Sequence, residues 1–524
     1  MTGITDDLRI WAWFFLAIYI IAMLFFGYLG MRRVKSSDDF AVARSSYGPI
    51  FLAFALTATA ASGGTFLGLP AIGYKYGLSS LWYATLYPLG TYLGLLLCLR
   101  GIRRAGANFG TRSLPEYLGD RFDSEAIRIC VALFSMLLLF YLAAQLLGGA
   151  VMFNKMMGLD LMTALIVTAV IVMIYILVGG AHADILTDGV QGALMLLLAI
   201  AVLIMFLVGF GVEGGLKTVL AQVEKQDPNL VSAFNPDSQI LDSKWDAIAI
   251  LIMHLPLGLL PHVANKLWAL KSDQDQNRFI TLSFLFGMLL PLITVGGILA
   301  RAVLGPELLV EGASPNDAIP ALFIATMPNW LAALIGAGVL AAIMSTADGL
   351  IVSTSQIFAN DIYRRSIVPR LPIRPGDADI DRVALVISRL ATAVVVVLAI
   401  WLAWQSQTMN LAILIAAGVG GMVSAISGPI FTGILWQGTT RTGALSGVFA
   451  GASVFFVAKL RWLDPVWFSA SPIEQAAIWF SNQAPNPFAC GTFGIVTSVA
   501  VTIIVSLFTE RPSIDHLRRL NQVA

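Results

Sequence analysis

Two hydroxyl side chains stand next to each other inside an apolar stretch of the chain, at Ser345 and Thr346. Hydroxyl and carbonyl oxygens are ligands that suit a hard monovalent cation such as Na⁺. Neighbouring residues of a helix point about 100° apart, so the two hydroxyls can flank one ion. In an alternative interpretation, each hydroxyl bonds back to a carbonyl one turn earlier, as is common in membrane helices.

Two long apolar stretches are interrupted by residues that break helices. The first has Ser-Gly-Gly at 62–64 and Gly-Leu-Pro at 68–70, and the second, at 254–262, holds two prolines. Unwinding a helix in lipid leaves backbone groups unpaired, at a cost on the order of several kcal/mol each, unless water, an ion or a solute satisfies them. Free carbonyls can then ligate a cation, and free amides can hold an anion. Alternatively, the glycine pair only lets two helices pack closely.

Two carboxylates also fall inside apolar stretches, at Asp188 and Asp348. Asp188 stands beside Thr187 and close to Gln191, while Asp348 follows Ser345 by three residues and shares its helical face. Ionisable groups inside membrane spans are rare and usually functional. The alternative is that Asp188 lies at the membrane surface and caps its helix.

The composition predicts that membrane helices position these groups. Of the 524 residues, 58% are hydrophobic and 12% are charged, against about 45–50% and about 25% in soluble domains. Many apolar runs exceed the roughly 20 residues that a helix needs to cross a bilayer, and none alternates as a barrel strand does. A net charge of +1 gives no electrostatic argument for nucleic-acid binding. The predicted fold class is therefore an all-α polytopic membrane protein.

Thirteen transmembrane helices are predicted. They lie near residues 10–31, 48–75, 79–100, 126–153, 161–179, 188–211, 246–265, 279–303, 329–359, 383–404, 408–436, 442–459 and 486–509. If the N-terminus is outside, the cytoplasmic segments hold 22 lysines and arginines and the outer segments hold 9, which is the bias typical of cytoplasmic loops. The predicted location is the cell inner membrane, with a periplasmic N-terminus and a cytoplasmic C-terminus. The first span has no cleavage site behind it and is expected to be retained.

The two interruptions fall in the second and seventh predicted spans. Five spans separate their starts, which indicates two inverted halves with the solute site between the broken helices. This predicts an inverted-repeat transport core at 48–436, with a first repeat at 48–211 and a second at 246–436. Residues 1–47 would form an extra helix and a cytoplasmic loop, and residues 437–524 extra helices and a cytoplasmic tail.

Four short motifs are spread along most of the chain. They are the Ser-Gly-Gly break with Gly68-Leu-Pro70, Gly179-Gly180 with Leu186-Thr-Asp-Gly-Val-Gln191, Pro261-His262, and Ala341-Ala-Ile-Met-Ser-Thr346 with Asn360-Asp-Ile-Tyr363. Through these motifs the chain resembles the sodium:solute symporter family, from Asp38-Asp-Phe40 to about Trp436. The resemblance implies the inverted-repeat fold of LeuT-type transporters, with five plus five helices.

The resemblance also implies where sodium binds. The conserved site of the family would take backbone carbonyls and two hydroxyls, at Ala58, Ala61, Ala342, Ser345 and Thr346. Because these oxygens are neutral, the affinity for the ion should be modest and sensitive to geometry. Some members of the family carry a second sodium ion, which here would be held by Asp188, Ser345 and Asp348.

The solute pocket is expected between the two breaks and the fourth span. Its predicted lining is Ser62, Gly63, Gly64, Thr65, Tyr141, Gln145, Met253, His254, Leu257 and His262. The proline-transporting branch has an acidic residue at the position of Ala60, a tryptophan at that of Gly64, and an aromatic pair at those of Met253 and Leu257, which argues against proline transport. His262 could instead be a structural histidine, and the side chains at 141 and 145 could simply pack helices.

A narrower resemblance, to the pantothenate and monocarboxylate branch, rests on three segments: Tyr74-Lys-Tyr-Gly-Leu78, Gly214 to Val231, and Leu260-Pro-His262. A small organic anion also fits the residues. Exposed amides near Gly63-Gly64, with the hydroxyls of Ser62 and Thr65, could hold a carboxylate without a buried arginine.

The function predicted from these features is sodium-coupled import of a small solute by alternating access, and the solute is expected to be an organic anion such as a monocarboxylate or pantothenate. Na⁺, the solute and the lipid bilayer are the expected partners, without nucleic acid, and a monomer is expected to function. One alternative is proton coupling through Asp188, Asp348 and His262. Others are an amino-acid symporter of the same fold and a non-transporting solute sensor. The sequence shows no catalytic pair among its four histidines, so an enzyme is not expected.

Overall fold

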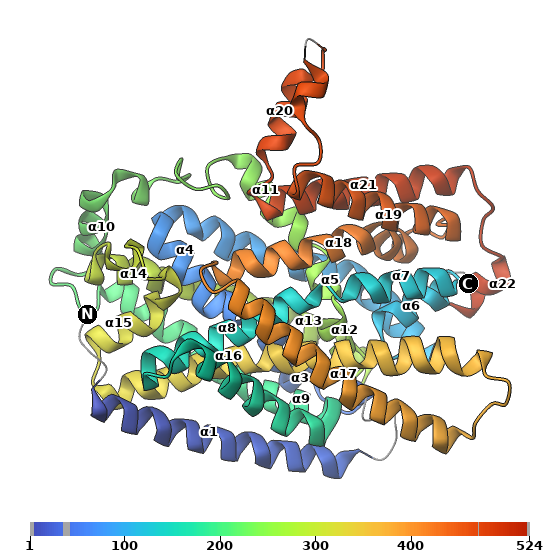
Figure 1. Ribbon diagram of the computed structural model, residues 1–524, viewed down its shortest axis with the longest axis horizontal. Coiled ribbons are helices and arrows are strands. Elements are labelled where there is room, and N and C mark those ends of the chain that lie inside the picture. The colour runs from blue at the N-terminus through green and yellow to red at the C-terminus, as the bar shows by residue number, and fades with distance from the viewer. Residues whose placement is uncertain (1–4, 35–41, 470, 521–524) are drawn as a thin grey trace.

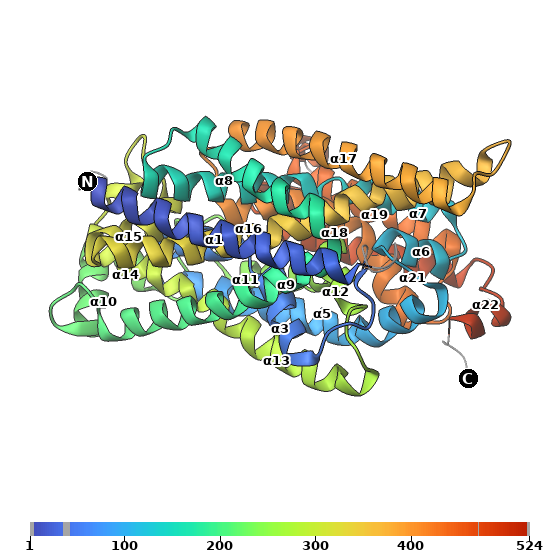
Figure 2. The same ribbon diagram turned by 90° about the horizontal axis from the view of Figure 1, so that it is seen from below.

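Long helices, most of them running along the longest axis of the molecule, make up the computed structural model of the chain (Figure 1). The structure describes residues 5–34, 42–469 and 471–520, and for 105–109, 174–180 and 273 it describes the backbone alone. The segment Asp38–Phe40, where the family resemblance begins, lies outside the described residues. The start of α1 (Asp6–Arg33) and the last described helix, α22 (Ile514–Arg519), lie at opposite ends of the long axis in both views (Figures 1 and 2), as expected for an odd number of crossings.

The helices follow one another with short connections. They are α1 (Asp6–Arg33), α3 (Pro49–Ala60), η1 (Gly64–Gly68), α4 (Leu69–Tyr76), α5 (Ser80–Phe109), α6 (Leu114–Arg121), α7 (Glu125–Ser135), α8 (Leu138–Met157), α9 (Leu161–Val208), α10 (Gly215–Gln226), α11 (Lys244–His254), η4 (Leu257–Leu259), α12 (Pro261–Leu267), α13 (Gln276–Leu289), α14 (Thr294–Leu304), α15 (Ala318–Thr326), α16 (Asn329–Gln356), η9 (Ile357–Ile367), α17 (Asp377–Gln405), α18 (Leu411–Leu435), α19 (Arg441–Lys459), α20 (Glu474–Asn482), α21 (Pro487–Leu507) and α22 (Ile514–Arg519). No β-strand occurs in the described part of the chain. The all-α polytopic fold class is confirmed.

Most of the predicted crossings are present. Among the described residues, ten helices are long and apolar enough to cross a membrane, and the bent pair α11–α12 makes eleven. Two further apolar helices, Pro49–Ala60 and Leu161–Met173, are shorter and fall in the second and fifth predicted spans, so the count of thirteen stays a prediction. The connection between the sixth and seventh predicted spans carries the short helix α10.

One continuous helix, α9, covers both the fifth and the sixth predicted spans. It begins beside the start of α1, because Arg9 donates a hydrogen bond to the carbonyl of Met157 (3.0 Å). Its middle packs against the other end of α1, where Ala183 lies within 2.6 Å of the position that a Cβ on Gly30 would take. Just after α9, Gly211 packs against the end of α15, which lies on the same side as the N-terminus (Figure 1). The chain therefore reverses within α9 and crosses twice.

Both predicted breaks are present. Helix α3 ends at Ala60, the chain then continues through the π-helical turn η1, and α4 resumes at Leu69. The seventh span bends by 54° between α11 and α12, where the two prolines each remove a backbone donor. The Thr57 carbonyl still accepts from the amide of Ala61 (2.9 Å). The last three carbonyls of α3, at Ala58, Thr59 and Ala60, lie where the helix stops, and they contact other groups.

The last two long helices, α19 and α21, hold α18 from one side through small residues. A Cβ on Gly451 would lie 2.1 Å from the carbonyl oxygen of Ser424, and one on Gly494 would lie 2.3 Å from the Ser424 hydroxyl. The amide of Gly428 donates to the Ser498 hydroxyl (3.0 Å). Such small residues let helix backbones approach closely, so the three helices share one tightly packed contact.

The motif at residues 360–363 ties η9 to the short helix α6. Asn360 donates to Glu116 (3.2 Å), Arg365 pairs with the same carboxylate, and the Ser113 hydroxyl donates to Asp361 (2.7 Å). Asp361 and Glu116 are both buried. The motif therefore has a structural task in this chain, which is to fix the end of the ninth span.

Asp120, on α6 beside this cluster, gives the fold a pH dependence. Burial, together with repulsion from Glu116, raises its pKa to about 6 from 3.8. A folded-state pKa above the unfolded value means that the ionised carboxylate destabilises the fold, so stability should rise as the pH falls from 7 to 4. We expect Asp120→Asn to raise the free energy of unfolding at pH 8 by about 2 kcal/mol.

Thermal unfolding of the purified protein between pH 4 and 8 measures this effect. The wild-type melting temperature should rise as the pH falls, and that of Asp120→Asn should change less. Asp377→Asn, at an exposed carboxylate, is the matched control and should leave the wild-type profile in place. A lower melting temperature for Asp120→Asn at pH 8 would show that the ionised carboxylate stabilises the fold.

Candidate functional site

The first break meets α16 at a cluster of oxygens. The Ser345 hydroxyl lies 3.1 Å from the carbonyl oxygen of Ala58 and 3.0 Å from that of Ala342. The Thr346 hydroxyl lies 3.2 Å from the carbonyl oxygen of Thr59. A serine hydroxyl has one proton and can satisfy only one carbonyl at a time, so three oxygens crowd together with one proton among them. A small cation can relieve that crowding.

The contacts of Ser345 and Thr346 differ from the alternative in which both hydroxyls bond only within their own helix, α16. Ser345 does contact the carbonyl of its own helix, at Ala342, but it reaches α3 as well. The Thr346 hydroxyl donates across to α3, at the carbonyl of Thr59. Ala61 is the residue at which the backbone turns extended after α3, and no hydrogen bond joins it to Ser345 or Thr346 among the described residues. Four of the five predicted ligands thus lie at the α3–α16 contact, and Ala61 lies at its edge.

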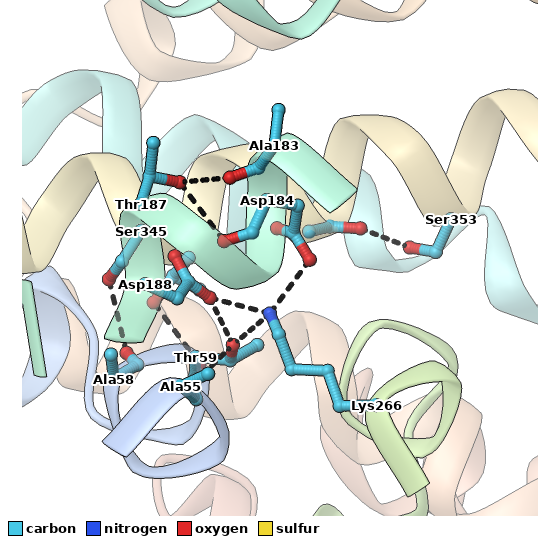
Figure 3. A network of polar contacts seen from close by, with 12 residues as sticks. Ala55, Ala58, Thr59, Ala183, Asp184, Thr187, Asp188, Lys266, Ser345 and Ser353 are labelled. Carbon is cyan, nitrogen blue, oxygen red and sulfur yellow. Dashed lines mark hydrogen bonds and ion pairs between the residues drawn. The ribbon is translucent and has the colours of Figure 1, made fainter. Parts of the chain in front are cut away.

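A buried ion-pair network adjoins these oxygens (Figure 3). The Lys266 ammonium, on α12, lies 2.5 Å from Asp188 and 2.9 Å from Asp184, and it also donates to the Thr59 hydroxyl. The Thr59 hydroxyl in turn lies 2.6 Å from Asp188. The side chains of Lys266 and Asp188 are 1% and 0% exposed. The three protons of the ammonium therefore have three acceptors, which a buried charge requires.

Asp188 thus has a partner that the sequence analysis did not find. The predicted seventh span ends at 265, so Lys266 was among the lysines and arginines assigned to the cytoplasmic segments. Asp184 and Asp188 are four residues apart and share a helix face, and two carboxylates on one buried face require a cation. That spacing is the signal that could have revealed the lysine. Asp348, the other member of the predicted second sodium site, is fully buried on α16.

A pocket lies between the two breaks, beside the oxygen cluster. Seven of the ten predicted residues line it, and α5 and α18 contribute walls that were not predicted. The lining is Ala60, Ser62, Gly64, Thr65, Leu69, Tyr83, Tyr87, Tyr141, Met253, His254, Leu257, Ala412, Ile415, Ala416 and Val419. No lysine, arginine, aspartate or glutamate is among these residues. The hydroxyl of Tyr87 donates to the carbonyl of Ala60 (2.8 Å), so the pocket wall supports the break.

Three predicted pocket residues do not line this cavity: Gly63, Gln145 and His262. The Gln145 side chain accepts a hydrogen bond from the amide of Gly63 (2.8 Å), and the amide of Gly64 donates to the Ser62 hydroxyl (3.1 Å). The two amides that were expected to be free for a carboxylate are therefore already bonded. The His262 ring packs edge-on against Tyr141, with centroids 5.4 Å apart.

The contact between Gln145 and Gly63 predicts a cost for losing it. Gln145→Met keeps the size of the side chain but leaves a buried amide without an acceptor, so we expect unfolding to become easier by about 1–3 kcal/mol. The melting temperature in detergent measures the change. Ser135→Ala is the control, because that buried hydroxyl bonds only within its own helix, to Val131. Equal melting temperatures for Gln145→Met and the wild type would mean that water or another group accepts the hydrogen bond of the Gly63 amide.

His254 has one ring nitrogen committed. Its Nδ1 lies 2.6 Å from the carbonyl oxygen of Ile250, and a carbonyl can only accept, so Nδ1 carries a proton. In the neutral ring Nε2 is then an acceptor. The ring is surrounded by Tyr83, Tyr87 and Phe488, with centroids 5.2–5.6 Å away. The pocket thus combines aromatic walls with a few hydrogen-bonding groups, the usual make-up of small-solute sites.

Comparison with known proteins identifies the family of the chain and its fold. The chain matches the sequence model of the sodium:solute symporter family over residues 40–451. The protein belongs to this family. A solved structure of a Na⁺-coupled sialic acid symporter has the same fold, with a TM-score of 0.73 at 22% identity, covering 96% of this chain and 99% of that one. The LeuT-type architecture inferred from the sequence is confirmed.

Relatives within the sodium:solute symporter family carry different solute names. The osmoregulated proline transporter OpuE of Bacillus subtilis is 25% identical over 510 residues, which is 95% of each chain. A sodium/pantothenate symporter of Haemophilus influenzae is 26% identical over 446 residues, covering 84% of this chain and 88% of that one. Both kinds of relative are transporters, and at this level of identity neither fixes the solute of this member of the family.

Proposed function

We propose that this member of the family is a sodium-coupled symporter that imports a small solute by alternating access. The observation that carries the proposal is the meeting of the Ala58 carbonyl, the Ala342 carbonyl and the Ser345 hydroxyl at the first break. These three oxygens come from two helices, so an ion bound by them would join α3 to α16.

The geometry suggests how ion and solute are coupled. The break that supplies Ala58 to the ion continues through Ser62, which lines the pocket. An ion that fixes the end of α3 therefore also fixes one wall of the solute site, and a bound solute fixes the backbone that the ion needs. Each ligand lowers the ordering cost for the other, which is reciprocal positive coupling.

The solute that we propose is a small organic anion, such as a monocarboxylate or pantothenate. The names of the pantothenate relatives support this class. Because the amides of Gly63 and Gly64 are bonded, the carboxylate would be held by the hydroxyls of Ser62, Thr65 and Tyr83 on the pocket wall. An amino acid is the second candidate, since proline transporters are among the relatives.

Counterflow in proteoliposomes tests the proposal. Vesicles loaded with unlabelled solute and diluted into labelled solute should accumulate label only for a transported compound, with a panel of carboxylates and amino acids and with Na⁺ or choline in the buffer. We expect accumulation of one carboxylate class, at least tenfold greater with Na⁺. Accumulation that follows pH and ignores Na⁺ would instead indicate proton coupling. If no compound accumulated under any condition, transport would be contradicted and the non-transporting solute sensor would be favoured.

The placement of the protein in the cell follows from the same proposal. The protein would be a multi-pass inner-membrane transporter and not an enzyme, with a periplasmic N-terminus and a cytoplasmic C-terminus, and a monomer would suffice for transport. The oxygen cluster and the pocket are formed by one chain, which is what a functional monomer needs.

A further inference from the structure

Lys266 places a buried positive charge next to the oxygen cluster that is proposed to bind sodium. Lys266 lies on α12, just after the 54° bend in the seventh span, and its side chain extends to Thr59 of α3 and to Asp184 and Asp188 of α9 (Figure 3). Its ammonium is 1% exposed and touches Asp184, Asp188 and Thr59. Burying an ammonium is costly unless its partners match it closely. The three acceptors around Lys266 show that this position is built for a positively charged side chain.

The ammonium uses only one oxygen of each carboxylate. Asp184 and Asp188 both lie against the single ammonium of Lys266, each through its Oδ2 atom. The Oδ1 atom of each carboxylate is buried and has no hydrogen-bond partner among the described residues. These two oxygens, with the two Oδ2 atoms, are the ligands that a mobile cation would find if the ammonium were removed.

The cluster is one residue away from the proposed sodium site. The Thr59 hydroxyl belongs to the ion-pair network, while the Thr59 carbonyl accepts from Thr346. The next oxygen along the backbone, on Ala58, belongs to the cluster around Ser345. A second mobile cation on Asp188 would lie directly against the ammonium, which already contacts that carboxylate at 2.5 Å. Like charges in contact in a medium of low polarity repel strongly, so that cation would have to displace the ammonium.

We propose that Lys266 is a tethered cation that occupies the place of a second coupling sodium ion, so that the protein binds one sodium ion and not two. This inference rests on the proposed function and adds its ion stoichiometry. The ammonium neutralises Asp188 throughout the cycle without being transported, and it leaves the Ala58–Ser345 cluster as the place for the one ion that is.

Equilibrium binding of ²²Na⁺ to the purified full-length protein tests this inference without knowledge of the solute. We expect one ion per wild-type protein at saturation. Lys266→Met keeps the length of the side chain and removes the charge, and it should bind two ions. Adding Asp188→Asn to Lys266→Met should return the number to one. Lys271→Met, at an exposed lysine of the following loop, is the matched control and should bind one.

The outcomes separate this inference from the proposed function. Two ions on the wild type, or one ion on Lys266→Met at saturation, would overturn the tethered cation and leave sodium coupling in place. No ion on the wild type would remove sodium coupling itself. If Lys266→Met does not fold, the wild-type number still decides, and Lys266→Arg, which keeps the charge, should again bind one ion.

Discussion

Replacing both hydroxyls, with Ser345→Ala and Thr346→Ala together, is expected to raise the Na⁺ concentration for half-maximal uptake by about 100-fold. Each hydroxyl is a neutral ligand to an ion, a contact worth about 1.5 kcal/mol, and two such losses come to about 3 kcal/mol, or roughly two factors of ten. At ordinary sodium concentrations, uptake should therefore be almost abolished. Solute uptake at graded Na⁺ in proteoliposomes measures the shift.

A third hydroxyl on the same helix provides the control for this experiment. Ser353 bonds back to the carbonyl of Gly349 (2.7 Å), one turn earlier and away from α3. Ser353→Ala should therefore leave the sodium dependence unchanged. If the double variant had the sodium dependence of the wild type, the α3–α16 contact would be only a helix-packing contact, and the coupling ion would bind elsewhere.

The second large effect is expected at Gly94, where α5 crosses the break of the seventh span. A Cβ there would lie 1.7 Å from the carbonyl oxygen of Leu255, so the methyl group of alanine must displace the backbone at the break. We expect Gly94→Ala to lower the free energy of unfolding by about 3 kcal/mol, the upper range for overpacking, and to reduce the amount of folded protein. The melting temperature in detergent measures the loss.

Gly338→Ala is the matched substitution for this experiment. Its Cβ would meet only a Leu198 methyl, at 3.6 Å, and alanine favours a helix over glycine by about 1 kcal/mol. This substitution should raise the melting temperature slightly. If Gly94→Ala also raised it, α5 and the second break would not be packed as closely as the structure shows.

The breaks could be predicted from the sequence because their causes are local. The Ser-Gly-Gly segment at 62–64 and the prolines at 256 and 261 end helices wherever they occur in a span. Most of the crossings were equally predictable, since apolar length decides them; among the described residues, ten or eleven of the thirteen are long and apolar enough. Even the reversal within α9 was expected, although the helix itself continues through it.

Side-chain partners between distant spans were harder to predict. Lys266 directly follows the end of its predicted span at 265, so composition assigns it to a loop, whereas the structure places it in the bundle after the bend at residues 254–262. The bond from Gln145 to Gly63 joins residues 82 positions apart, and nothing in either local sequence specifies it. The pocket walls from α5 and α18 were missed for the same reason, because they depend on how whole helices pack.

The close packing of α18 against α19 and α21 has a consequence for motion. With backbone against backbone at Ser424 and Gly451, α18 has no room to tilt by itself. It also carries one wall of the pocket, from Ala412 to Val419. Any movement that opens the solute site on that side must therefore carry α19 and α21 with it as one rigid unit, although both helices follow the predicted transport core at 48–436.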